Sequence, residues 1–115
     1  MKPPAGREKR LTSPAQYACV YHECITQADR WLVLKARPNH LEWARYGISV
    51  SKRIGSAVVR NRVKRVLREI LRLAALNPGW DFVVIARVPA AKSNYTQLKE
   101  SLTRLLVKTS SRAKT

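Results

Sequence analysis

Residues 56–76 constrain the fold of this chain most, because they combine a helical apolar stripe with a dense run of bases. Apolar side chains recur there about every 3.6 residues, which predicts an amphipathic helix that packs one face on a sheet. The stripe consists of Val59, Val63, Val66, Leu67, Ile70, Leu71 and Ala74. Gly55 and Ser56 open the helix, and Asn77-Pro78-Gly79 ends it.

The segments before this helix predict one short helix and a series of strands. Ser13 followed by Pro14 is a helix start, because serine caps the first turn and proline has no N–H to leave unpaired there. This helix is expected to end near residues 22–24. Strands are predicted at 31–37 and 45–51, with a weaker edge-strand signal at 24–28. The two stronger strands would be antiparallel if they form a hairpin.

The segments after the basic helix predict a central strand and a third helix. DFVVIA (81–86) is a nearly continuous apolar run, typical of a strand that helices cover. Asn94 with Gln97 resembles a capping box, and the inward stripe that follows is Tyr95, Leu98, Leu102, Leu105 and Leu106. The predicted order is α-β-β-β-α-β-α, an α/β (α+β) two-layer sandwich with a four-stranded mixed sheet. Strands 45–51 and 81–86 are expected to be parallel neighbours joined by helix 56–76.

Length and charge limit the organisation of the chain. Its 115 residues suffice for one domain, and 23 Lys and Arg against 7 Asp and Glu give a net charge of +16. We expect a flexible basic tail over 1–10, a single folded domain over 11–107 and a flexible tail over 108–115. No apolar run approaches the length of a membrane span, and the N-terminus lacks the apolar stretch of a secretory signal. A cytoplasmic location is therefore expected.

The bases of helix 56–76 indicate a polyanionic partner. Arg60, Lys64 and Arg68 recur at intervals of four and therefore lie along one side of the helix. Over residues 52–72 a single acid, Glu69, stands against eight bases, so a solvated face stabilised by ion pairs is the weaker interpretation. Arginine dominates, and its planar fork suits bidentate contacts with phosphate.

Candidate catalytic and metal-ligating residues are few. The seven acids are scattered singly, whereas two-metal phosphodiester hydrolysis needs clustered carboxylates, so no catalytic residue is assigned. Cys19, His22 and Cys24 fit no standard zinc spacing, and no metal site is assigned. Both cysteines are expected to be free thiols in a reducing compartment. Trp43 and Trp80 are interpreted as structural.

The segment GISVSKRIGSAVVRNRVKRVLREILR (47–72) closely resembles the signature of the bacterial ribonuclease P protein component. That family carries a strand ending in Ser-Lys-Lys/Arg, then Gly-x-Ala-Val, then Arg-Asn-Arg-x-Lys-Arg-x-x-Arg-Glu. The resemblance extends to DFVVIAR and to the aromatic-bearing first helix, and it covers residues 9–108.

This resemblance implies a protein that binds the catalytic RNA of ribonuclease P, which removes 5′ leaders from precursor tRNA. The RNA performs the hydrolysis with Mg2+ that it mainly holds itself, and the protein is a monomer present in one copy per RNA. The resemblance also implies a left-handed crossover between strands 45–51 and 81–86, against the general preference for right-handed connections. By matching positions, the residues implied to contact the catalytic RNA are Lys52, Arg53, Arg60, Asn61, Arg62, Lys64, Arg65 and Arg68.

The resemblance further implies a cleft between the first helix and the sheet that holds the single-stranded leader. Tyr17 and Tyr21 match the aromatic positions of that helix, and Lys35 and Trp31 are assigned to the strand side. From the residues alone, core aromatics are the favoured interpretation of both tyrosines, because buried aromatics are the common case. Two other functions stay open: an rRNA-binding ribosomal-type protein, and a DNA-binding protein with helix 56–76 in a major groove.

Overall fold

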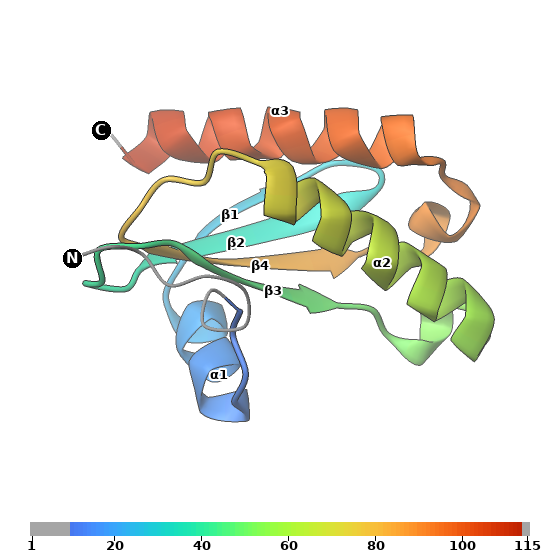
Figure 1. Ribbon diagram of the computed structural model, residues 1–115, viewed down its shortest axis with the longest axis horizontal. Coiled ribbons are helices and arrows are strands. Elements are labelled where there is room, and N and C mark those ends of the chain that lie inside the picture. Colours follow the sequence, from blue (N-terminus) through green and yellow to red (C-terminus); the bar gives the residue numbers. More distant parts are fainter. Residues whose placement is uncertain (1–9, 114–115) are drawn as a thin grey trace.

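The structure is a computed structural model that describes residues 10–113, in which helices lie on both sides of one sheet (Figure 1). Its elements in chain order are α1 (Pro14–His22), β1 (Ile25–Ala28), β2 (Leu32–Pro38), β3 (Arg45–Ser49), the 3-10 turn η2 (Lys52–Ile54), α2 (Ala57–Leu73), β4 (Trp80–Ala86), the 3-10 turn η3 (Val88–Lys92) and α3 (Tyr95–Ala113). Figure 1 shows α2 and α3 on one side of the sheet and α1 on the other. The predicted order of elements is confirmed.

The four strands lie in the order β1-β2-β4-β3. β3 pairs with β4 in parallel, which confirms the predicted neighbours joined by α2. β2 pairs with β4 antiparallel, so the alternative of a hairpin between 31–37 and 45–51 is wrong. The apolar β4 takes the central position between them, where both of its faces are covered. The left-handed sense of the crossover stays a prediction.

The main core lies between the sheet and helices α2 and α3. Its fully buried residues include Leu32 and Leu34 of β2, Val63 and Leu67 of α2, and Leu98, Leu102 and Leu105 of α3. A smaller cluster of Leu11, Val20 and Val83 packs α1 on the opposite face. Tyr95, predicted to point inward, is exposed at the first position of α3.

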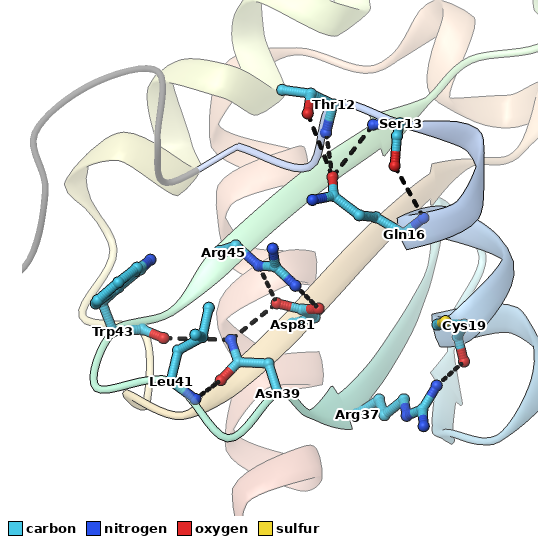
Figure 2. A network of polar contacts seen from close by, with 10 residues as sticks. All are labelled: Thr12, Ser13, Gln16, Cys19, Arg37, Asn39, Leu41, Trp43, Arg45 and Asp81. Carbon is cyan, nitrogen blue, oxygen red and sulfur yellow. Dashed lines mark hydrogen bonds and ion pairs between the residues drawn. The ribbon is translucent and has the colours of Figure 1, made fainter.

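The predicted helix starts are confirmed in atomic detail. Figure 2 shows the capping box of α1, in which Ser13 Oγ accepts from Gln16 N at 3.2 Å and Gln16 Oε1 accepts from Ser13 N at 3.1 Å. At the start of α2, Ser56 Oγ accepts from Val59 N at 3.3 Å. The helix ends at Leu73, before the predicted end at 76, because Ala74 has extended backbone angles.

The predicted C-terminal tail over 108–115 is wrong for the residues up to 113, which continue α3. Thr109 is buried there, and its hydroxyl donates to Leu105 O at 2.8 Å. This is the bond to the carbonyl four residues earlier that threonine can form within a helix. Of the predicted N-terminal tail, residues 1–9 lie outside the described residues. Arg10 forms a bridge with Tyr46 beside β3. Within the described part of the chain, no helix has the length and apolar character to cross a membrane.

A partly buried ion pair joins the first residue of β3 to the second residue of β4 (Figure 2). Arg45 contacts the Asp81 carboxylate through Nε at 2.9 Å and Nη2 at 2.8 Å, and this bond raises the pKa of Arg45. Asn39 Nδ2 donates to the same carboxylate at 2.8 Å and also to Trp43 O at 3.2 Å. The connection between β2 and β3 is therefore fixed to the sheet.

Asp29, in the turn between β1 and β2, connects the sheet to α3. Its Oδ1 accepts from the backbone N–H groups of Trp31 and Leu32 at 2.8 and 3.0 Å. Its Oδ2 accepts from the Ser101 hydroxyl at 2.5 Å and from Arg104 at 3.2 Å. Burial alone raises the pKa of Asp29, but these hydrogen bonds outweigh it and hold the pKa below the ordinary 3.8.

A carboxyl with a lowered pKa stabilises the fold above its unfolded pKa, and this contribution is lost as the pH falls through the folded pKa. Asp29→Ala should therefore lower the free energy of unfolding at pH 7 by about 1–2 kcal/mol and flatten its dependence on pH below about 4. Urea titrations at a series of pH values measure both effects. Glu100→Ala, which removes an exposed acid from α3, is the control and should change little. An Asp29→Ala curve parallel to that of the parent below pH 4 would contradict this assignment.

Candidate nucleic-acid interface

Helix α2 buries one side and presents basic side chains on the other. Its buried residues are Val63, Leu67, Ile70 and Leu71, which pack on the sheet and α3. Asn61, Arg65 and Arg68 are exposed, and Arg60 and Lys64 are half-buried. The packing of the apolar stripe thus fixes the direction in which these cations point.

Two more exposed basic residues lie just before the start of this helix. Lys52 and Arg53 belong to η2, which the chain leaves through Gly55 with a φ of 152°. A side chain at Gly55 would be strained at this angle, so glycine permits the sharp entry into α2. The first turn of α2 contains no acid, and helix N-terminal N–H groups favour an anion. We call this surface the basic face, made up of Lys52, Arg53, Arg60, Asn61, Lys64, Arg65 and Arg68.

Arg62, which was also predicted to contact RNA, is directed elsewhere. Its Nη2 donates to Ala91 O at 2.6 Å and its Nη1 to Ser93 O at 3.2 Å. Both carbonyls lie at the end of η3, so Arg62 fastens α2 to this turn. The structure therefore does not group Arg62 with the basic face.

Most cations of the basic face have no acidic partner among the residues that the structure describes. Within α2, Glu69 pairs with Arg72 at 2.7 Å, and the hydrogen bond from Arg72 lowers the pKa of Glu69. Among the described residues, no ion pair involves Arg60, Arg65 or Arg68. The charge of this surface is thus available to an external anion.

The two tyrosines of α1 lie differently. Tyr17 is half-buried over Gly47 of β3, where an added Cβ would lie 2.5 Å from the Tyr17 hydroxyl oxygen. Burial raises the pKa of Tyr17, although a hydrogen bond with the Ile48 backbone opposes the shift. Tyr21, one turn later, is 42% exposed and has an accessible ring. The structure thus makes Tyr17 a partly structural residue and Tyr21 the more open one.

Two basic residues of β2 lie on the same face of the sheet as α1. Arg37 Nη1 donates to Cys19 O at 2.8 Å and so holds the end of α1 (Figure 2). Lys35 Nζ donates to Thr26 Oγ1 of the neighbouring β1 at 3.2 Å. Lys35 was predicted for this side, whereas Arg37 was missed. Arg37 could have been predicted from the sequence, because side chains alternate along a strand and residues 35 and 37 therefore lie on the same face of the sheet.

Trp31 is not brought together with the tyrosines. It packs against the main core, on the opposite face of the sheet, and the Arg30 guanidinium lies 4.9 Å from its ring centroid. Trp31 precedes β2 and lies in the turn that Asp29 fixes, so strand alternation does not govern its direction. Of the two residues predicted for the strand side of a leader cleft, only Lys35 therefore lies on the same face of the sheet as the tyrosines.

The cysteines are free, as predicted: Cys19 is exposed and Cys24 lies 3.4 Å from Thr26 Oγ1. In the described part of the chain, no three His, Cys, Asp or Glu side chains are grouped so as to hold a metal ion.

Comparison with known proteins identifies the family. The family model for ribonuclease P matches residues 5–110. A ribonuclease P protein component from Caldanaerobacter subterraneus subsp. tengcongensis is 45% identical over 107 residues, which cover 90% of this chain and 92% of that protein. One from Dehalococcoides mccartyi is 44% identical over 99 residues, 86% of this chain and 82% of that protein.

Solved structures agree with the sequence comparison. The RNase P protein of Staphylococcus aureus superposes with a TM-score of 0.79 at 34% identity, over 85% of this chain and 92% of that one. The RNase P protein of Thermotoga maritima superposes with a TM-score of 0.78 at 29% identity, over 84% of this chain and 94% of that one. With the strand–glycine–helix arrangement of the basic face, these matches show that the chain belongs to the ribonuclease P protein family.

Proposed function

We propose that this chain is the protein subunit of ribonuclease P. It binds the catalytic RNA through the basic face and assists removal of the 5′ leader from precursor tRNA. The observation that carries this proposal is the row of unneutralised cations on α2, in a chain of this family. Their spacing along one helix side suits a phosphate backbone, which supplies most of the affinity of such contacts.

The chemical step is assigned to the RNA partner. The protein's own His, Cys, Asp and Glu side chains are not grouped within the described residues, so Mg2+ would be held mainly by RNA phosphates. Mg2+ bound there would activate water and stabilise the leaving oxygen. The protein contributes charge and substrate contacts, one copy per RNA, in the cytoplasm. Arginine and lysine lower the repulsion between RNA strands that must come together.

The leader side is assigned to the face of the sheet that carries α1. The exposed ring of Tyr21 can stack on an unpaired base, and Lys35 and Arg37 place positive charge nearby on β2. Tyr17 packs against Gly47 of β3 and so helps to hold α1, which carries Tyr21, on the sheet. Trp31 has no part in it, since it packs on the other face.

The function is tested by reconstitution. The protein should be recovered from cells with one RNA, identified by sequencing as ribonuclease P RNA, and should raise cleavage of precursor tRNA at low Mg2+. Recovery with ribosomal subunits would instead indicate a ribosomal protein, and tight sequence-specific binding to duplex DNA would indicate a DNA-binding protein. Either result would overturn the proposal.

Arg65→Ala should weaken binding to the catalytic RNA about tenfold and make the log–log salt slope shallower by about 1, because one phosphate contact is lost. Arg65 is exposed on α2, so the melting temperature should hardly change. Filter binding over a salt series measures both quantities. Lys99→Ala removes the same charge from α3 and is the matched control, expected to bind like the parent. Equal losses for the two variants would mean that only net charge matters.

Tyr21→Ala should lower the affinity of the reconstituted enzyme for precursor tRNA by about tenfold, since stacking on a base contributes about 1–3 kcal/mol. Its affinity for mature tRNA, which lacks the leader, should hardly change. Tyr21→Phe keeps the ring and should bind both ligands like the parent. Paired binding measurements with the two tRNAs decide the matter. If Tyr21→Ala weakened both ligands equally, Tyr21 would not contact the leader.

A further inference from the structure

A cavity of about 680 Å3 lies beside the basic face. It lies between the second half of α2, the 39–44 connection, β3 and the segment after α2. Its volume is within the range of about 300–1,000 Å3 that ligand sites occupy. The residues that line it combine an apolar wall, two aromatic side chains and three arginines.

The aromatic wall is held in place by the connection between β2 and β3. Trp43 O accepts from Asn39 Nδ2 at 3.2 Å and from Gly79 N at 3.2 Å, so the backbone on both sides of the cavity is fixed. Asn39 is in turn bonded to the buried Asp81 (Figure 2). The interpretation of Trp43 as structural thus holds for its backbone, while its half-buried indole forms part of the cavity wall beside Tyr46. The backbone that carries the Trp43 ring is thus fixed, which lowers the cost of ordering the ring as a stacking surface.

The charge of the cavity is positive. Arg10, Arg68 and Arg72 line it, against the single acid Glu42 among its described lining residues. Arg72 is paired with Glu69, whereas no ion pair among the described residues involves Arg68. Arg68 also belongs to the basic face, one turn beyond Lys64 and two beyond Arg60. The row of cations along α2 therefore leads into the cavity.

We infer that this cavity binds an unpaired nucleotide of the RNA that occupies the basic face, with its base against Trp43 and its phosphate at Arg68. This inference rests on the proposed function and adds to it a base-binding site that the row of phosphate contacts does not include. An aromatic surface beside an arginine is how proteins hold single-stranded RNA, through stacking and charge together.

Other occupants are disfavoured by charge. Residues 1–9 of this chain contain Lys2, Arg7 and Lys9 against Glu8, so they would bring further positive charge to three arginines. A second copy of the chain carries +16 and would be repelled in the same way. A neutral apolar ligand would leave Arg68 without a partner. A nucleotide satisfies both the aromatic wall and the cations.

Two variants test the cavity in different ways, by binding to ribonuclease P RNA. Trp43→Leu removes the stacking ring, and Ala74→Phe fills the cavity from a lining residue with extended backbone angles that accept any side chain. Each should weaken binding about tenfold, whereas Trp43→Phe, which keeps a ring, should lose less than about threefold. Chemical probing of the RNA should show one unpaired nucleotide that the parent protects and that both variants leave reactive.

Arg65→Ala separates this inference from the proposed function. If Arg65→Ala weakens binding while Ala74→Phe and Trp43→Leu bind like the parent with an unchanged footprint, the cavity stays empty in the complex and the inference is wrong. If all three bind like the parent, the proposed function is wrong as well. Should Trp43→Leu fail to fold, Ala74→Phe decides alone, because it removes no contact of the parent side chain.

Discussion

The packing of α2 on the sheet is the contact on which the rest of the molecule depends. Val63, Leu67 and Leu71 bury one side of the helix, and burial of each large apolar side chain contributes about 1.5–3 kcal/mol. That attachment has to overcome the repulsion within a chain of net charge +16. It also gives the helix a single rotation about its axis. The cations therefore lie on the side of the helix opposite its buried stripe, where an anion can reach them.

One sheet thus separates two surfaces of different character. Its central strand β4 sends Phe82 and Val84 into the main core and Val83 toward α1, so both faces are occupied by packing. On the α1 side, Tyr17 reaches across to Gly47 of β3, the strand that leads through η2 into the basic helix. Tyr17 of α1 and helix α2, which carries the basic face, both contact β3. This strand therefore fixes the position of α1 relative to the basic face. Rigid spacing of this kind allows two parts of an RNA complex to be held together.

Much of this arrangement could be predicted from local patterns. Helical periodicity, the Ser13 cap and the apolar run of β4 each determine an element through its own residues. Errors arose where the determining partner is distant in sequence. An apolar run does not say which strands will flank it, so the hairpin alternative was wrong. The polar residues after 107 suggested a tail, although Ser110 of α3 accepts a hydrogen bond from Asn77, 33 positions away in sequence.

Arg62 shows the same limit within the most specific motif of the chain. Successive residues of a helix point about 100° apart, so Arg60, Asn61 and Arg62 cannot all face one ligand. Arg62 lies about 200° from Arg60 and meets the carbonyls of Ala91 and Ser93, which are 29 and 31 positions away in sequence. Carbonyl groups at the end of a helical turn carry partial negative charge and attract a guanidinium. The motif therefore serves two purposes, since the half-buried Arg60 belongs to the basic face and Arg62 holds in place the helix that carries it.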